Sequence, residues 1–210
     1  LTLYAQWKPL SGTSNGYNWI DLGLPSGTKW ATMNVGADSP EDYGDYFAWG
    51  ETTPKSTYNW STYKWCKGDY DTQTKYCTSS SYGTVDNKTT LDLSDDAAYV
   101  NWGTSWRMPT EAELNELEEN CTCTWTIRNG VSGRKVTSKV NGNSIFLPAA
   151  GYRYGSELYN AGSSAGFWSS SLTTYDSGYA YGLYFNSANV YISNNYRYYG
   201  QSVRLCSEVK

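Results

Sequence analysis

The residues that most often carry enzymatic chemistry are scarce in this chain. It has 210 residues and no histidine, so hydrolysis by a serine–histidine pair is excluded. A carboxylate pair for glycoside hydrolysis stays formally possible, because Asp42, Asp45 and Glu51 could meet in space. A solvated or helix-capping role is the better interpretation of these three acids. We therefore expect no enzyme activity.

The five cysteines leave at least one thiol unpaired within the chain. Cys66 and Cys77 flank a polar loop and could form a disulfide, whereas Cys121 and Cys123 would share one face of a strand. Cys206 stands alone near the end of the sequence. No cysteine has the spacing of a zinc site, and buried free thiols are the expected state. We expect no metal site and no cofactor.

Charge and hydropathy exclude two classes of partner. The formal net charge is -4 and the sequence pI is about 4.9, whereas a nucleic-acid-binding surface needs a basic stripe. No apolar run has the length that a membrane-spanning segment requires. Residues 69–71, Asp-Tyr-Asp, are a fragment of a calcium-loop pattern that lacks the glycine and the terminal glutamate. We therefore expect neither nucleic acid nor a membrane span.

The stretch 166–204 interleaves two kinds of residue. Tyrosine, asparagine, serine, aspartate and glycine alternate with apolar residues, in the composition of an antibody paratope, where rigid tyrosine supplies contact area. Turns are predicted at 186–189 and 193–195. The alternative is a tyrosine-rich strand pair in a polar β protein, since tyrosine is a good strand former. The apolar positions have the period of strands with one buried face, and they are Leu183, Phe185, Val190, Ile192, Val203 and Leu205.

The elements that must position this stretch combine strands with short helices. A hairpin is predicted over 19–34 with its turn at Pro-Ser-Gly, and further strands over 122–127, 134–140 and 145–147. Helices are predicted from Ser39, from 94–96 towards Gly103, and after the capping box 110–113. Residues 52–90 and 151–164 are predicted loops, and a loop as long as 52–90 is usually functional. The fold class is α+β, with short helices packed on small antiparallel sheets and long irregular loops.

Several motifs resemble a known family. GFWSSS, LYFNSANVYISNN and RYYGQSVR resemble the variable region of a diversity-generating retroelement target protein. WIDLGLPSGTKWATMNVGA, YGDYFAWGE, WRMPTEAELNEL and IFLPAAGYRYG resemble a Bacteroidetes-type surface domain with a C-type-lectin-like, formylglycine-generating-enzyme-like fold. The activity of the formylglycine enzymes is not carried over, because they use a late cysteine pair and only Cys206 lies late here. LTLYAQWKP at 1–9 resembles the end of a Listeria–Bacteroides surface repeat.

The resemblance implies a domain plan and a function. Residues 1–9 would be the tail of an upstream repeat module, 10–16 a linker, and 17–207 a C-type-lectin-like domain whose variable region spans about 154–199. The domain would bind an unknown protein or glycan ligand at a cell surface, on an exported bacterial or phage-encoded protein. The expected ligand-binding residues are Tyr154, Glu157, Tyr159, Asn160, Thr174, Tyr175, Asp176, Ser177, Tyr179, Tyr181, Gly182, Tyr184, Asn189, Tyr191, Ser193, Asn194, Asn195, Tyr196, Tyr198 and Tyr199.

A second hypothesis places the site elsewhere. A fixed-specificity carbohydrate-binding module would use the tryptophan-rich middle of the chain, since exposed aromatic rings stack on sugars. Trp49, Trp60, Trp65 and Trp102 would form that site, although core packing is the commoner role of large aromatic residues. A structural role as a stalk or pilus-tip adhesin domain is a third possibility.

Overall fold

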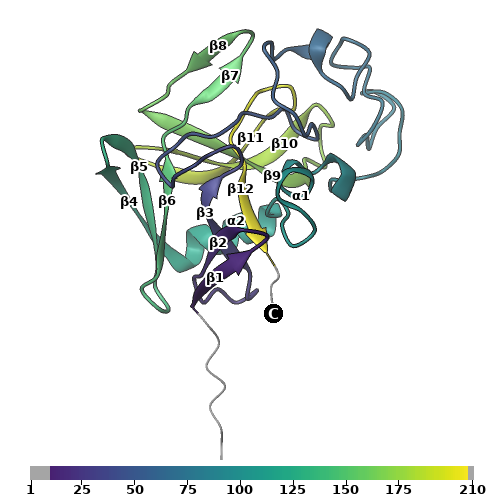
Figure 1. Cartoon of the computed structure of the whole chain (residues 1–210). Helices are drawn as coiled ribbons and strands as arrows, with labels where there is room; N and C mark the ends of the chain where they lie inside the picture. The colour runs from purple at the N-terminus through teal and green to yellow at the C-terminus, as the bar shows by residue number, and fades with distance from the viewer. Residues whose placement is uncertain (1–9, 208–210) are drawn as a thin grey trace, which may run out of the picture.

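Four small antiparallel sheets carry the fold, and a computed structural model describes residues 10–207 (Figure 1). The expectation for residues 1–9 lies outside the described residues. The predicted combination of short helices and small antiparallel sheets is confirmed. The first sheet has the order β1-β2-β3-β12 and consists of β1 (Ser11–Ser14), β2 (Tyr17–Asp21), β3 (Lys29–Asn34) and β12 (Arg204–Ser207).

The other three sheets follow one another along the second half of the chain. The sheet β4-β5-β6 contains β4 (Cys121–Arg128), β5 (Val131–Ser138) and β6 (Ser144–Pro148). The hairpin β7-β8 contains β7 (Tyr152–Tyr154) and β8 (Glu157–Tyr159). The sheet β11-β10-β9 contains β9 (Ser164–Leu172), β10 (Tyr179–Asn186) and β11 (Val190–Tyr196).

The predicted linker over 10–16 is wrong. Residues 11–14 form β1, which pairs along its whole length with β2. Asn15 and Gly16 adopt φ angles of 49° and 83°, the left-handed conformation that a tight two-residue hairpin turn requires. The Asn-Gly pair therefore makes the segment a hairpin and not a flexible connection.

Two of the three predicted helices form. α1 (Ala97–Trp102) begins after Asp96, whose carboxylate accepts the amides of Ala98 and Tyr99, and α2 (Glu111–Asn120) begins with the predicted capping box at Thr110. The helix expected at Ser39 is wrong. The Asp42 carboxylate accepts the Ser39 amide there, and the chain closes an isolated turn. Two short 3-10 helices, Trp60–Thr62 and Leu93–Asp95, complete the helical elements of the described residues.

Two details of the C-terminal stretch differ from expectation. Residues 151–164 are not an irregular loop, because 152–159 form the hairpin β7-β8. Residues 193–195 are not a turn, because they lie inside β11, opposite 180–182 of β10. The predicted turn at 186–189 is confirmed, and the Asn186 side chain accepts the amides of Ala188 and Asn189 there.

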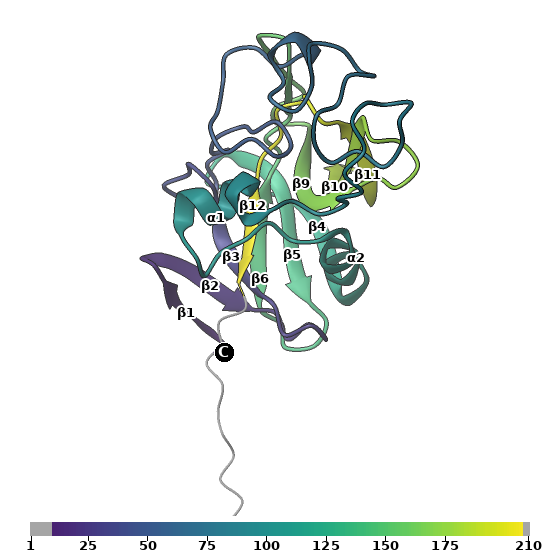
Figure 2. The same cartoon turned by 90° about the vertical axis from the view of Figure 1, so that its right-hand side faces the viewer.

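The core consists of three clusters of buried side chains. One lies beneath α1 and includes Trp49 and Trp106, and a second lies beneath α2 and includes Leu114 and Phe185. The third is built largely of tyrosine and includes Tyr58. Figures 1 and 2 show that β1 and the last described residue lie at one end of the molecule, with β7-β8 and the long 52–90 segment at the other. The tyrosine cluster supports that second end.

Candidate functional site

Ten aromatic rings form one continuous group at the end of the molecule that carries β7-β8, and the group also contacts the buried ring of Tyr63 through Trp60. They come from three places in the chain: the 52–90 segment, the β7-β8 hairpin, and β10-β11 with the residues that follow. We call this group the aromatic surface, and one of its rings, Tyr198, is itself buried. It consists of Trp60, Tyr70, Tyr82, Tyr152, Tyr154, Tyr159, Tyr179, Tyr196, Tyr198 and Tyr199.

Close contacts between the rings stabilise the aromatic surface. Tyr196 lies at its centre and stacks on Tyr179 with ring centroids 4.4 Å apart and on Tyr198 at 5.5 Å. Trp60 meets the edge of Tyr198 at 4.8 Å, and Tyr199 stacks on Tyr152 at 5.4 Å. These separations match the stacked and edge-to-face arrangements that aromatic pairs prefer. The rings are therefore positioned by one another before any ligand arrives.

A layer of buried tyrosines supports this surface. Each hydroxyl bonds to the backbone: Tyr46 donates to the carbonyl of Ala150 at 2.5 Å, Tyr58 to that of Tyr46 at 2.7 Å, and Tyr63 to that of Trp49 at 2.7 Å. Burial raises the pKa of all three hydroxyls above the ordinary tyrosine value. They therefore stay neutral donors at physiological pH.

Arg197 fixes the long 52–90 segment against the β-sheet. Its guanidinium is fully buried and donates to the hydroxyl of Tyr63 at 2.8 Å and to the carbonyl of Ser177 at 2.8 Å. It also donates to the carbonyls of Lys75 and Tyr76 at 3.0 and 3.2 Å. One side chain thus links three segments that are far apart in sequence.

The 173–178 loop and the long segment also contact each other directly. The Tyr70 hydroxyl donates to the Asp176 carboxylate, and burial together with this acceptor raises the pKa of the hydroxyl. Ser177 accepts the amide of Thr78 at 2.9 Å. A Cβ atom at Gly178 would collide with the Tyr70 ring, so only glycine allows this close approach. The loop is therefore held in one arrangement.

The predicted ligand-binding residues divide between two faces of the β9–β11 sheet. Successive side chains of a strand alternate between faces. Tyr181 and Asn194 share the face of Tyr179 and Tyr196, but Tyr184 and Tyr191 form a separate pair on the opposite face, with ring centroids 5.2 Å apart. The residues of that opposite face also include Gly182, Ser193 and Asn195. The predicted site is thus not a single surface.

Three predicted residues are buried, and for them the surface prediction is wrong. Tyr198 is 7% exposed because Trp60 and the tyrosine cluster cover it. Ser177 is fully buried beneath the long segment, and Gly182 lies against the Phe167 carbonyl of the neighbouring strand. The remaining predicted residues outside the sheet faces are exposed or half-buried; they are Tyr154, Glu157, Tyr159 and Asn160 of the hairpin, Thr174, Tyr175 and Asp176 of the loop, Asn189 of the turn, and Tyr199.

Sequence reasoning missed four members of the aromatic surface. Trp60 was assigned only to the alternative sugar site, and Tyr70, Tyr82 and Tyr152 were not assigned to either site. The usable signal was the unusual length of the 52–90 segment combined with its aromatic content. The position of the 52–90 segment in the fold depends on the buried Arg197 contacts, and no local sequence pattern predicts these contacts.

The alternative tryptophan site is not assembled. Trp49 is completely buried and Trp102 is 5% exposed, stacked on Tyr17 at 3.6 Å. Trp65 is half-buried between Lys64 and Lys75, whose ammonium groups lie 4.2 and 4.8 Å from its ring centre. Only Trp60 reaches the aromatic surface.

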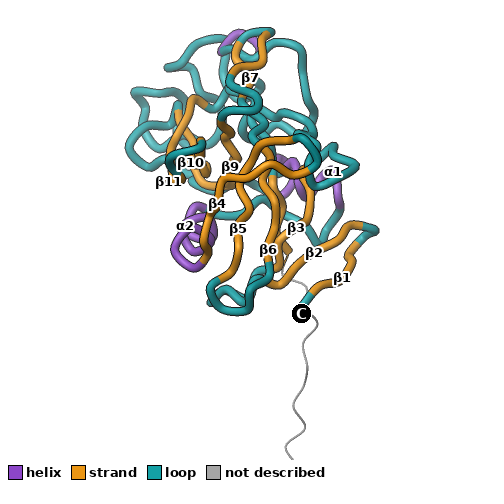
Figure 3. The backbone as a smooth tube through the Cα atoms, turned by 90° about the vertical axis from the view of Figure 1, so that its left-hand side faces the viewer, coloured by secondary structure: helices purple, strands orange, loops and turns teal. Residues whose placement is uncertain are grey.

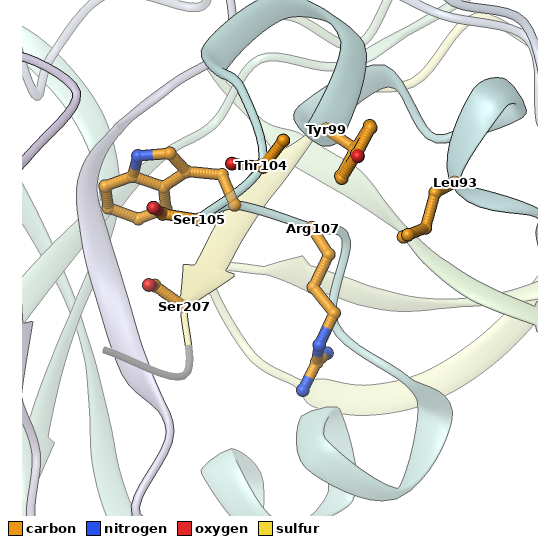
Figure 4. Close-up of a pocket in the computed structure, with 7 residues that line it drawn as sticks. Leu93, Tyr99, Thr104, Ser105, Arg107 and Ser207 are labelled. Atoms are coloured by element: carbon orange, nitrogen blue, oxygen red, sulfur yellow. The ribbon is translucent and has the colours of Figure 1, made fainter. Parts of the chain in front are cut away.

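A pocket lies beside α1, away from the aromatic surface (Figure 4). Its volume is about 310 Å³. Arg107 lines it, and the Arg107 guanidinium binds both carboxylate oxygens of Glu113 at 2.6 and 2.7 Å. The other lining residues are Leu93, Tyr99, Thr104, Ser105, Trp106 and Ser207.

Glu51 and the cysteines, which could carry chemistry, make the following contacts. Glu51 pairs with Lys55 at 2.8 Å and accepts the amide of Lys64. All five cysteines are unbridged, and burial, with the neighbouring Cys123, raises the pKa of the Cys121 thiol to about 11. None of the helices in residues 10–207 has the length and apolar content of a membrane span.

The comparisons with known proteins assign no activity. A family model described as a domain of unknown function (DUF8237) matches residues 133–206. The matched residues extend from β5 to β12 and include the C-terminal part of the aromatic surface, but not the 52–90 segment. No curated protein and no solved structure shows significant similarity to the chain.

Proposed function

We propose that this chain is a ligand-binding protein that uses the aromatic surface to hold a protein or glycan, without turnover. The observation that carries the proposal is the continuous group of ten rings, gathered from three distant segments at the end of the molecule opposite β1 and the last described residue (Figure 1). A surface gathered at one end of the molecule suits recognition of a partner on a cell or phage surface.

The physical properties of the aromatic surface favour recognition. Tyrosine offers a large contact area and a hydroxyl on a side chain with few rotors, so little conformational entropy is lost on binding. Tyr154 and Tyr159 are 46% and 41% exposed and contact each other, with ring centroids 6.2 Å apart. Their positions are set by the neighbouring rings. Binding therefore needs little rearrangement.

We also propose that a retroelement diversifies this surface. The scaffold would have the C-type-lectin-like fold that the sequence motifs resemble, and the short helices and small antiparallel sheets are compatible with it. Exposed positions in β7-β8, the 173–178 loop and β11 would vary, whereas buried positions such as Arg197 would stay fixed. Each copy would then recognise a different ligand on the same framework.

Population sequencing of the 3′ end of the gene, beside any near-repeat in the same genome, tests the diversification. We expect substitutions confined to adenine positions in codons for exposed residues such as Tyr154, Tyr179 and Tyr191, with the codons for Arg197 and Trp168 unchanged. A uniform sequence with no template copy would overturn retroelement diversification. The binding proposal would then rest on the aromatic surface alone.

A binding screen tests the surface itself. The purified protein is screened against a glycan array and a phage-displayed library of linear peptides, and each hit is measured with the double variant Tyr154→Ala, Tyr159→Ala. We expect the double variant to lose at least about tenfold in affinity, because two exposed anchors are removed. Ile127→Ala is the control, since Ile127 is 68% exposed and lies on β4, outside the aromatic surface and the β11-β10-β9 sheet. Binding that survives the double variant would contradict the proposal.

A further inference from the structure

β11 is the outer strand of the β11-β10-β9 sheet (Figures 2 and 3). Its seven residues, VYISNNY, contain no charge and no proline, and its pairing with β10 has no bulge. Proteins usually protect an edge strand with one of these features, because an unprotected edge pairs with other chains. β11 borders the aromatic surface through Tyr196. An unprotected edge at that place calls for a functional explanation.

The register of the hairpin shows which backbone groups of β11 point outward. Asn186 donates its amide to the carbonyl of Asn189 at 3.0 Å, and Arg197 donates its amide to the carbonyl of Gly178 at 3.0 Å. In an antiparallel pair, hydrogen-bonded positions alternate with non-bonded ones. Residues 191, 193 and 195 therefore bond to β10. The amides and carbonyls of 190, 192, 194 and 196 point away from the sheet.

Most of these outward groups have no partner among residues 10–207. The Tyr196 carbonyl accepts the amide of Tyr199 at 2.9 Å. The amides and carbonyls of Ile192 and Asn194 make no hydrogen bond to another described residue. They form a row of alternating donors and acceptors at the spacing of one strand. The chemistry that matches such a row is the backbone of another extended polypeptide.

The edge of β4 provides an internal comparison. β4 is also an outer strand, but Arg134 reaches around it and donates to the carbonyl of Cys123 at 2.7 Å. The same guanidinium donates to the carbonyl of Asn186 at 2.6 Å, in the β10-β11 turn. The β4 edge is therefore covered by the chain itself at Cys123. The β11 edge between 192 and 196 has no such cover in the described residues.

We propose that the partner of this protein is an extended polypeptide segment that adds a strand to the free edge of β11. This inference rests on the proposed binding function and names its ligand class. An added strand would direct alternate side chains to opposite faces of the sheet. One set would meet Tyr179 and Tyr196, and the other would meet Tyr184 and Tyr191. This explains how residues on both faces serve one site, which a ligand lying on a single face cannot do.

The test replaces one outward-pointing amide. Asn194→Pro removes the donor at the free edge but leaves the bonds of residues 193 and 195 to β10, and edge positions of this kind tolerate proline. Asn194→Ala is the matched control, because it removes the same side chain and keeps the amide. The probe is a linear peptide of about twelve residues selected from the phage-displayed library. We expect Asn194→Pro to weaken its binding at least tenfold and Asn194→Ala less than threefold.

Hydrogen exchange of the wild-type complex keeps the test independent of variant stability. We expect the selected peptide to slow exchange at the amides of Ile192, Asn194 and Tyr196. Equal binding to both variants with unchanged exchange at these amides would overturn the inference, and so would a screen that yields glycans but no peptide. In those cases, loss of binding in the Tyr154→Ala, Tyr159→Ala variant would still support the proposed function. Retained peptide binding in that variant would contradict the proposed function alone.

Discussion

The two tyrosine pairs of the β10-β11 hairpin have the same composition and different surroundings. Tyr179 faces Tyr196 with ring centroids 4.4 Å apart, and Tyr184 faces Tyr191 at 5.2 Å. The first pair occupies a non-bonded position of the ladder, where side chains lie closer together, and the second a bonded one. The odd spacing of five residues puts the pairs on opposite faces. Trp60 contacts Tyr196, whereas the Tyr184–Tyr191 pair has no further ring contact among the described residues.

The difference between the two pairs shows which contacts join tyrosines into one continuous surface. Both pairs come from the same two strands, and both consist of tyrosines that alternate with apolar residues. Only the Tyr179–Tyr196 pair is extended by rings from the 52–90 segment and from β7-β8. The contacts between distant segments therefore decide which tyrosines act together. These contacts depend on a few buried residues, and replacing those residues tests whether the 52–90 segment assembles the aromatic surface.

Replacement of Arg197 has the largest expected effect. Arg197→Met removes the donors to the Tyr63 hydroxyl and to the carbonyls of Ser177, Lys75 and Tyr76; the Tyr63 hydroxyl still donates to the Trp49 carbonyl, but the three carbonyls lose this partner. We expect the free energy of unfolding to fall by about 3 kcal/mol or more, because unsatisfied buried polar groups are costly. Urea unfolding measures this value.

Arg153→Met is the control for the loss of an arginine at this end of the molecule. The Arg153 guanidinium lies over the Tyr46 ring at 5.1 Å and is only half-buried. We expect a loss below about 1 kcal/mol for this variant. Equal stability losses in the two variants would show that Arg197 has no special role in holding the 52–90 segment.

Two tyrosine-to-alanine changes distinguish the packed face of the hairpin from the face that carries Tyr184 and Tyr191. Tyr198→Ala should cost about 3 kcal/mol, because it empties a buried position between Trp60 and Tyr196. Tyr191→Ala should cost less than about 1 kcal/mol, because Tyr191 is 45% exposed. Thermal unfolding of both variants checks this order. A reversed order would mean that the Tyr184 face carries the packed surface.

Local patterns in the sequence predict much of the scaffold. The capping box at Thr110 and the N-cap near Asp96 are encoded in a few adjacent residues, and the structure contains both. The alternation of Leu183 and Phe185 correctly places their side chains in the core. Ser39 shows the limit of such patterns, because an isolated cap without an apolar face to bury gives a turn.

The candidate site could be predicted only in part. Composition indicated tyrosines between 154 and 199, but without the strand register it could not show that Tyr196 lies opposite Tyr179 and Tyr191 opposite Tyr184. It also could not show that Tyr198 is buried or that Trp60 and Tyr70 join the surface. Both outcomes depend on contacts between residues more than a hundred positions apart. Such contacts have no local signature.

A third prediction concerns α2, which packs against β10 and β11 and covers the apolar middle of the hairpin. Glu113 anchors its first turn. Burial disfavours the charged carboxylate, but hydrogen bonds from Arg107, Thr110 and Thr28 outweigh it and lower the pKa of Glu113 to about 2. Its contribution of about 2 kcal/mol is therefore present above about pH 4.5 and is lost as the pH falls towards 2.

Glu113→Gln tests this contribution, because other carboxylates titrate equally in both proteins and cancel in the difference. We expect the wild type to be more stable than the variant by about 2 kcal/mol at pH 7, and the gap to narrow progressively below pH 4.5. Urea unfolding at several pH values measures the gap. A gap that does not change with pH would mean that the shape of the side chain, and not its charge, fixes α2. In that case acid would not weaken the packing of α2 on the apolar middle of the hairpin through Glu113.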